Sequence, residues 1–169
     1  PWEEFVKERI LDPLGMSNTL TSTTQLSNVT NVAIPHNDLD DKVIAIDYLN
    51  WDNIAPAGAL LSSSSDMLKW LQFQLHKGKW NDSTLVSAKS MHEIWSAQTV
   101  QNVSTNSERL WPSTHFKAYG LGWGLMDYHS RKIISHSGGY DGMISYSAFV
   151  PEENLAFVIL TNKNSSLYY

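Results

Sequence analysis

The sequence of 169 residues contains no cysteine, no long apolar run and no cluster of basic residues. The absence of cysteine excludes thiol catalysis, disulfide bonds and cysteine metal sites. The longest apolar stretch, near residues 156–160, is far shorter than the ~20 residues that a membrane-spanning helix needs. The 12 basic residues are dispersed among 17 acidic ones, and the net charge is -5. The sequence therefore predicts no membrane span in this chain and no nucleic-acid partner.

What is present favours a folded domain. Hydrophobic residues make up 42% of the chain, with 7 Trp, 7 Tyr and 5 Phe, which is too apolar for a disordered segment. A chain of this length buries about 70% of its extended-chain surface, enough for one core. The six histidines show no pair at the helical spacing of metal ligands, so we expect no metal site and no cofactor.

The first part of the chain is predicted to combine a helix with a long irregular segment. Apolar residues at helical spacing predict an amphipathic helix over 1–11, ended by Asp12-Pro13. Residues 17–57 are polar and lack a sustained period, which favours an irregular segment with two short strands, near 32–34 and 43–46.

Two further helices are predicted before the chain changes character. The capping box Ser63-x-x-Asp66 begins a helix that Gly78 is placed to end, and a second helix begins at Ser87. Residues 100–115 lose the pattern and are predicted to form a loop. The residues expected to face the core from these helices are Met67, Leu71, Leu75, Met91, Ile94 and Trp95.

From Tyr119 onward the period changes to two. Four strands are predicted over 120–125, 132–137, 143–150 and 155–161, with a turn at 151–154. Their short connections imply an antiparallel meander. The predicted fold class is α+β, an antiparallel sheet with helices packed on it. We expect one domain over 1–169, with a helical and loop part over 1–118 and strands over 119–162.

Three tryptophans, Trp51, Trp80 and Trp111, lie in polar segments. An aromatic residue in such a segment either closes over the core or lines a cleft. The sequence leaves both alternatives open for each of the three.

The glycine-rich segment from His136 to Gly142 is the clearest candidate for chemistry. It lies at the end of one predicted strand and leads into the next, and its glycines allow a ligand to approach the backbone closely. His136 and Ser137 beside exposed N–H groups could bind a carboxylate or an oxyanion. The alternative is a glycine-rich hairpin loop with an exposed histidine. Adjacent residues of a strand point to opposite faces, so His136 cannot activate Ser137 as a nucleophile.

Five blocks in order resemble the serine β-lactamase-like and penicillin-binding-protein-like hydrolases, in their class C β-lactamase branch. They are Asp12-Pro13-Leu14-Gly15-Met16-Ser17-Asn18-Thr19, Pro56-Ala57-Gly58-Ala59-Leu60 with Ser62–Leu71, Tyr119-Gly120-Leu121-Gly122-Trp123, His136-Ser137-Gly138-Gly139 and residues 156–162. The resemblance covers nearly the whole chain. It implies an α/β sandwich of the β-lactamase/transpeptidase type.

The resemblance also implies roles for the glycine-rich segment. His136-Ser137-Gly138 stands where Lys-Thr-Gly stands in β-lactamases. By that match His136 and Ser137 contact the substrate or the proton relay, and the Gly139 N–H is one donor of the oxyanion hole. Gly138 and Tyr140 are then expected to bind substrate.

The nucleophile motif of that family, Ser-x-x-Lys, is absent, because none of the nine lysines has a serine three positions earlier. Tyr48-Leu49-Asn50 spells the family's Tyr-x-Asn element, but it follows the turn at Pro13-Leu14-Gly15-Met16 instead of preceding it, so we interpret it as a chance match. The resemblance therefore implies that the nucleophile and the catalytic tyrosine lie upstream of Pro1. The chain is expected to be the C-terminal portion of a catalytic domain, incomplete at its N-terminus.

The expected function is part of a serine hydrolase that works through an acyl-enzyme on a β-lactam, a D-amino-acid peptide or a small ester. The isolated chain is expected to be inactive. The alternative is a non-catalytic ligand-binding or sensor module with a penicillin-binding-protein-like fold. Members of the family are mostly bacterial and exported, so the resemblance implies a periplasmic, extracellular or cell-surface location. The sequence does not predict the oligomeric state.

Overall fold

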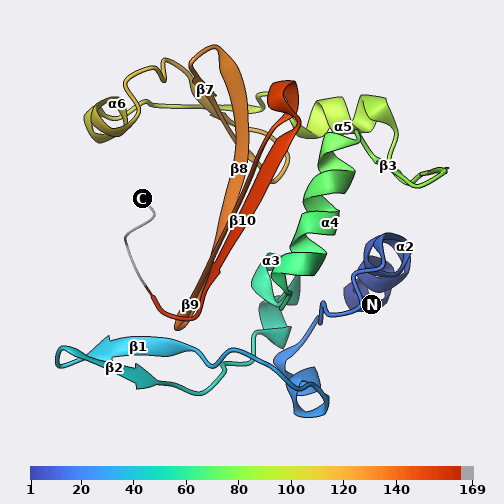
Figure 1. Cartoon of the computed structure of the whole chain (residues 1–169), viewed down its shortest axis with the longest axis vertical. Coiled ribbons are helices and arrows are strands. Elements are labelled where there is room, and N and C mark those ends of the chain that lie inside the picture. Colours follow the sequence, from blue (N-terminus) through green and yellow to red (C-terminus); the bar gives the residue numbers. More distant parts are fainter. Residues whose placement is uncertain (165–169) are drawn as a thin grey trace. The chain divides into compact units, whose positions relative to one another are not determined.

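The computed structural model describes residues 1–164, and it has the predicted α+β composition (Figure 1). The chain divides into two compact units. The first contains Pro1–Met67, Ser137–Tyr146 and the described residues from Val158 on, and the second contains Leu68–His136 and Ser147–Phe157. Four elements contribute residues to both units: α4 (Ser64–Leu75), β8 (Arg131–Tyr140), β9 (Met143–Val150) and β10 (Leu155–Thr161).

The remaining helices are short. They are α1 (Trp2–Val6), α2 (Asp12–Leu14), α3 (Ala55–Gly58), α5 (Ala88–Ile94) and α6 (Thr105–Leu110), with a π-helical turn η1 (Lys7–Leu11) and the 3-10 turns η2 (Thr23–Asn28), η3 (Asp52–Ile54) and η4 (Pro151–Glu153).

The N-terminal helix forms as predicted, but its predicted end at Asp12-Pro13 is wrong. Helical structure continues through Pro13 and ends at Gly15, whose φ of 67° is left-handed. Pro13 is the second residue of α2 and follows the π-helical turn directly, and it has no N–H to donate to the preceding turn. The π-helical turn before it brings residues five apart together, and Lys7 Nζ lies 2.6 Å from the Asp12 carboxylate.

The predicted helix from Ser63 is confirmed as α4, and its first turn is tied to a distant segment. Ser63 Oγ accepts a hydrogen bond from the Asp66 N–H at 3.3 Å. The buried Asp66 carboxylate accepts bonds from the Asn18 N–H at 2.7 Å and from Thr19 Oγ1 at 3.0 Å. Thr19 Oγ1 also lies 2.8 Å from Ser62 Oγ. A buried carboxylate therefore joins α4 to the chain that follows α2.

The main sheet has six strands in the order β10-β9-β8-β7-β6-β5. Its other members are β5 (Thr99–Gln101), β6 (Lys117–Tyr119) and β7 (Gly124–Tyr128). The predicted strands over 143–150 and 155–161 are confirmed. The strand predicted over 120–125 is wrong, because Gly122 has a φ of 83° and the Gly120 N–H bonds to the Trp123 carbonyl at 2.8 Å, which makes a turn between β6 and β7.

Two predictions for the irregular segments also fail. The predicted loop over 100–115 contains α6 and the end of β5; Ser104 caps α6 by accepting a bond from the Ser107 N–H at 3.1 Å. The predicted strand near 32–34 does not form, since the chain becomes a strand only after Pro35, in β1 (His36–Leu39). The strand near 43–46 is confirmed as β2 (Lys42–Ala45), which pairs with β1. A further two-stranded pair joins β3 (Lys79–Trp80) to β4 (Ser83–Thr84).

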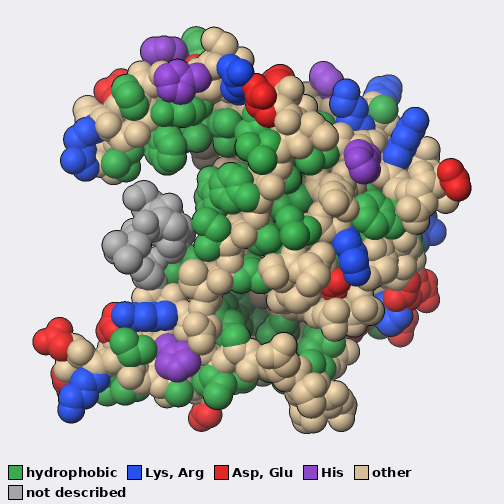
Figure 2. Space-filling model, in the orientation of Figure 1, with side chains coloured by type: hydrophobic (Ala, Val, Ile, Leu, Met, Phe, Trp, Pro, Cys, Tyr) green, Lys and Arg blue, Asp and Glu red, His purple; other side chains and the backbone are tan. Residues whose placement is uncertain are grey.

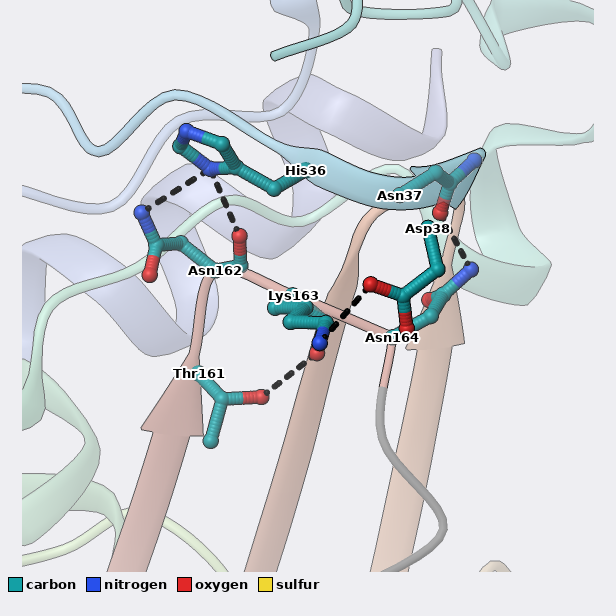
Figure 3. A network of polar contacts seen from close by, with 7 residues as sticks. All are labelled: His36, Asn37, Asp38, Thr161, Asn162, Lys163 and Asn164. Carbon is teal, nitrogen blue, oxygen red and sulfur yellow. Dashed lines mark hydrogen bonds and ion pairs between the residues drawn. The ribbon is translucent and has the colours of Figure 1, made fainter. Parts of the chain in front are cut away.

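The β1–β2 hairpin exposes both apolar and charged side chains, and Figure 2 shows acidic and basic side chains gathered over its tip. A polar network joins β1 to the residues after β10 (Figure 3). Asn162 Nδ2 donates to the Ile34 carbonyl at 3.0 Å, and Asn164 Nδ2 donates to Asn37 Oδ1 at 2.8 Å. Lys163 Nζ lies 2.9 Å from the Asp38 carboxylate. These contacts hold the first unit together across more than 100 residues of chain.

The core of the second unit is built around Phe149, which is fully buried. The rings of Trp95 and Trp123 lie 5.2 and 5.1 Å from it in edge-on geometry. Trp95 Nε1 donates to Gln74 Oε1 at 3.2 Å, so these two buried polar atoms are paired. Of the predicted core residues, Leu71, Met91 and Trp95 are buried, whereas Met67, Leu75 and Ile94 are only half-buried.

Asp127 on β7 anchors the chain that enters β6. Its carboxylate accepts hydrogen bonds from the backbone N–H groups of His115 and Phe116, at 2.9 and 2.6 Å. Burial by itself raises the pKa of this carboxyl, but the backbone donors and the nearby His115 lower it further, so the pKa lies below its ordinary 3.8.

No helix within residues 1–164 is both long and apolar enough to span a bilayer.

The Asp66→Ala variant is expected to lower the free energy of unfolding by about 2–4 kcal/mol, because the Asn18 N–H and the buried Thr19 hydroxyl lose their acceptor. Denaturant unfolding measures this change. The matched control is Asp82→Ala, at an exposed turn position, which is expected to change the value by about 0.5 kcal/mol or less. Equal losses in the two variants would contradict a special role for the buried carboxylate.

Asp127→Asn is expected to change the acid dependence of stability. A carboxyl with a lowered folded-state pKa stabilises the fold above its unfolded pKa and loses that contribution as the pH falls through the folded value. The difference in unfolding free energy between the native protein and Asp127→Asn should therefore shrink as the pH falls below about 4. Thermal unfolding between pH 3 and 7 tests this, and a constant difference would disprove it.

Candidate functional site

Strand β8 extends beyond its partner β7 and leaves an open edge. The two strands pair from Tyr128 opposite Arg131 to Gly124 opposite Ser135. Since β7 begins at Gly124, residues 136–140 of β8 continue past the paired region. The glycine-rich segment is therefore mostly strand, and the predicted strand over 132–137 is three residues longer at its C-terminal end.

The register determines which backbone groups face that open edge. His129 and Ser130, which join β7 to β8, have φ values of 47° and 62°, typical of a two-residue hairpin loop. The residues that flank such a loop exchange hydrogen bonds, and antiparallel pairing repeats this at every second residue. Counting every second residue along β8 from Arg131 leads to Ser137 and Gly139. Their N–H and C=O groups therefore point to the side where β7 has ended, and within the described chain the sheet has no other strand there.

The glycines of this segment have different surroundings. A side chain at Gly138 would meet Ser145 Oγ on β9 at 2.5 Å, so glycine allows the two strands to approach. A Cβ at Gly139 would meet nothing within 4 Å. Ser137, Gly138 and Gly139 are all exposed, so a ligand can reach the backbone of the segment.

His136 is exposed, but its ring has a partner. Its Nε2 lies 2.8 Å from the Tyr119 hydroxyl, and the ring centroids are 6.2 Å apart. Ser147 Oγ donates to the His136 carbonyl at 3.3 Å. Tyr119 belongs to one of the family blocks in the sequence and was not predicted to be a partner of the site. Its signal was present only as the first residue of Tyr119-Gly120-Leu121-Gly122-Trp123.

Tyr140, expected to bind substrate, makes its contacts inside the first unit. Its hydroxyl donates to the Leu49 carbonyl, and its ring lies 5.0 Å from that of Trp51. Burial raises the pKa of Tyr140 above its ordinary 10.0 although the Leu49 bond lowers it, so the hydroxyl is neutral at physiological pH. Trp51 in turn covers Gly58, where a Cβ would meet the indole at 3.1 Å. For Trp51 the structure supports a packing role.

The Tyr48-Leu49-Asn50 element makes local contacts. The Tyr48 hydroxyl donates to the Ala33 carbonyl, and burial raises its pKa. Asn50 Nδ2 donates to the Asp52 carboxylate at 3.0 Å, and Asn50 Oδ1 accepts from the Asp52 N–H at 2.7 Å. The side chains of Tyr48 and Asn50 thus shape their own segment, in line with a chance match.

The turn after β8 is fastened to β1. Gly142 has a φ of 74°, and a Cβ there would meet the His36 nitrogen and Pro35 at 2.7 Å. The Gly142 carbonyl accepts a hydrogen bond from the His36 N–H at 3.1 Å. The His36 ring continues the contact, with Nδ1 3.0 Å from the Asn162 carbonyl (Figure 3).

Among the residues that the structure describes, no group of three histidine or acidic side chains could hold a metal ion.

The chain resembles known hydrolases over nearly all of its length. The family model described as Beta-lactamase matches residues 1–167. The chain is 27% identical to the "Unguisins hydrolase ungD'" of Aspergillus campestris, over 96% of this chain and 29% of that protein. It is 25% identical to the "D-alanyl-D-alanine-carboxypeptidase/endopeptidase AmpH" of Escherichia coli K12, over 95% of this chain and 40% of that protein. The chain thus spans about a third of the length of these relatives.

A solved structure supports the fold. The octameric penicillin-binding protein homologue from Pyrococcus abyssi superposes with a TM-score of 0.79 at 22% identity, over 96% of this chain and 34% of that one. The predicted α+β fold of the β-lactamase/transpeptidase type is confirmed. The class C branch stays a prediction.

A pair of glycine variants tests how the hairpin is held. Gly142→Ala is expected to lower the free energy of unfolding by about 2 kcal/mol, because alanine disfavours the left-handed φ and its Cβ meets backbone atoms. Gly139→Ala, in open space with an ordinary strand φ, is expected to change it by about 0.5 kcal/mol or less. Denaturant unfolding of both variants compares the two. A neutral Gly142→Ala would show that the turn is not constrained by β1.

Proposed function

The chain belongs to the beta-lactamase family, and we propose that it supplies the substrate-facing strand of a serine hydrolase that works through an acyl-enzyme. The observation that carries this proposal is the open edge of β8, where Ser137 and Gly139 direct backbone N–H and C=O groups away from the last pairing with β7. An exposed edge of this kind binds an extended peptide by adding it as a further strand.

In this proposal the Gly139 N–H acts where charge develops. A serine hydroxyl gives its proton to a base as its oxygen attacks the substrate carbonyl carbon, the C=O electron pair moves to oxygen, and a tetrahedral oxyanion forms. When the C=O bond re-forms, the C–N bond breaks and the amine leaves with a proton from that base, which gives the acyl-enzyme. A backbone N–H directed at that oxygen stabilises it without reorganisation. No Ser-x-x-Lys occurs in the 169 residues, so the nucleophile and its base are assigned to another part of the protein.

Peptide amides are the substrate class that we favour. The names of two relatives describe hydrolysis of unguisins and of D-alanyl-D-alanine peptides. A β-lactam carboxylate is bound less strongly at this position, because His136 stands where β-lactamases have lysine, and an imidazole is a weaker anchor for an anion than an ammonium. D-amino-acid peptides therefore rank ahead of β-lactams and small esters. An exported location, as in the bacterial members of the family, stays a prediction.

The second candidate is a module that binds peptides without cleaving them. The same open edge supports it, because strand addition requires only the backbone of β8. The two candidates differ in whether a reactive serine exists in the protein.

Active-site labelling of the longest natural form of the protein distinguishes them. A fluorescent penicillin and a fluorophosphonate are expected to label one serine outside the 169 residues, identified by peptide mass, and the isolated chain is expected to remain unlabelled. His136→Ala and Ser137→Ala are expected to lower kcat/KM for a D-alanyl-D-alanine peptide at least tenfold. The controls are His76→Ala and Ser83→Ala, at exposed positions away from β8. No label on folded protein favours the binding module, and full activity in both β8 variants overturns the site.

A further inference from the structure

Tyr119 and His136 form a side-chain pair that bridges two strands. Tyr119 ends β6 and His136 lies on β8, with β7 between them in the sheet. Tyr119 pairs with Gly124, and Gly124 pairs with Ser135, so the 2.8 Å contact between the Tyr119 hydroxyl and His136 Nε2 lies where β7 begins. Both residues belong to the second unit.

The chemistry of the two groups determines which one donates. The phenol O–H is a stronger acid than a neutral imidazole N–H, and the imidazole nitrogen is a stronger base than a phenol oxygen. The stronger bond therefore has the Tyr119 O–H donating to an unprotonated Nε2. A neutral imidazole with an unprotonated Nε2 carries its proton on Nδ1.

We propose that Tyr119 is a positioning residue that holds His136 as the Nδ1–H tautomer and leaves Nδ1–H as the donor for a substrate oxygen. Nδ1 has no hydrogen-bond partner among the described residues, and the His136 side chain is exposed, so a ligand can reach it. The substrate group that fits is a neutral or anionic oxygen, such as the carbonyl of a peptide. The effect on turnover rests on the proposed function, whereas the tautomer does not.

The tautomer is measured by two-bond 1H–15N correlation NMR on the longest natural form of the protein with 15N-labelled histidine, at a pH where the imidazole is neutral. His136→Gln identifies the signals by their loss. The native protein is expected to show a protonated Nδ1, and Tyr119→Phe is expected to shift protonation toward Nε2. Tyr128→Phe is the matched control, since that tyrosine lies in the same sheet without contacting His136, and it should leave the pattern unchanged.

If His136 carries its proton on Nε2 in the native protein, the proposal is wrong. This measurement needs no variant of Tyr119, so it decides the question even if Tyr119→Phe does not fold. An unchanged tautomer in folded Tyr119→Phe also overturns it.

Activity is the second readout. Tyr119→Phe is expected to lower kcat/KM for a D-alanyl-D-alanine peptide about tenfold, the effect of one lost hydrogen bond. In a His136→Gln background the same change should have little further effect, because the two residues act through one contact. Equal losses in both backgrounds contradict positioning through His136. If the protein turns over no substrate, the proposed function fails while the tautomer measurement still decides the role of Tyr119.

Discussion

The unequal pairing of β7 and β8 is the constraint on which the candidate site depends. The two strands are joined by the tight turn at His129 and Ser130, which sets their register. β7 is five residues long and β8 is ten, so within residues 1–164 the second half of β8 has no partner strand on that side. Because antiparallel pairing alternates, this single register decides that Ser137 and Gly139 present their backbone groups at the edge. If the register between β7 and β8 shifted by one residue, the backbone groups of Gly138 would point to the edge in place of those of Ser137 and Gly139.

An unpaired strand end must be held by other means. β9 supports it on the opposite side, and Gly138 allows close contact with Ser145 there. Beyond the strand, Tyr140 is bonded to the Leu49 carbonyl and Gly142 to the His36 N–H. Leu49 and His36 both lie in the polar segment before α3, so that segment holds the turn after β8 in place. It fixes the β8–β9 hairpin, whose residues Ser137, Gly138 and Gly139 remain exposed. In the proposed function this fixed position is what a backbone oxyanion donor requires.

The parts of the fold that followed from the sequence are those set by local chemistry. The cap at Ser63, the cap at Ser87 and the apolar faces of α4 and α5 depend on neighbours three or four residues away, and the predicted helices formed. The wrong predictions lie where contacts with distant residues determine the conformation of the chain. The apolar alternation at Gly120–Trp123 is typical of a strand, yet Gly120 lies against the Ile94 carbonyl and the chain turns. The pairing of His136 with Tyr119, seventeen residues away along the chain, could not be predicted from the residues around either of them.

Replacement of lysine by histidine on the central strand changes what the strand can recognise. An ammonium is a point charge that attracts any nearby carboxylate, with no direction built in. A neutral imidazole has one donor and one acceptor, and it discriminates only if a neighbour fixes which nitrogen carries the proton. The Tyr119 hydroxyl, two strands away, is such a neighbour. A lysine ammonium has no tautomer to fix, so the same hydroxyl would not make it more selective. In the proposed function, the Tyr119 contact and the histidine at position 136 together give directional recognition of a substrate oxygen in place of long-range attraction to a charge.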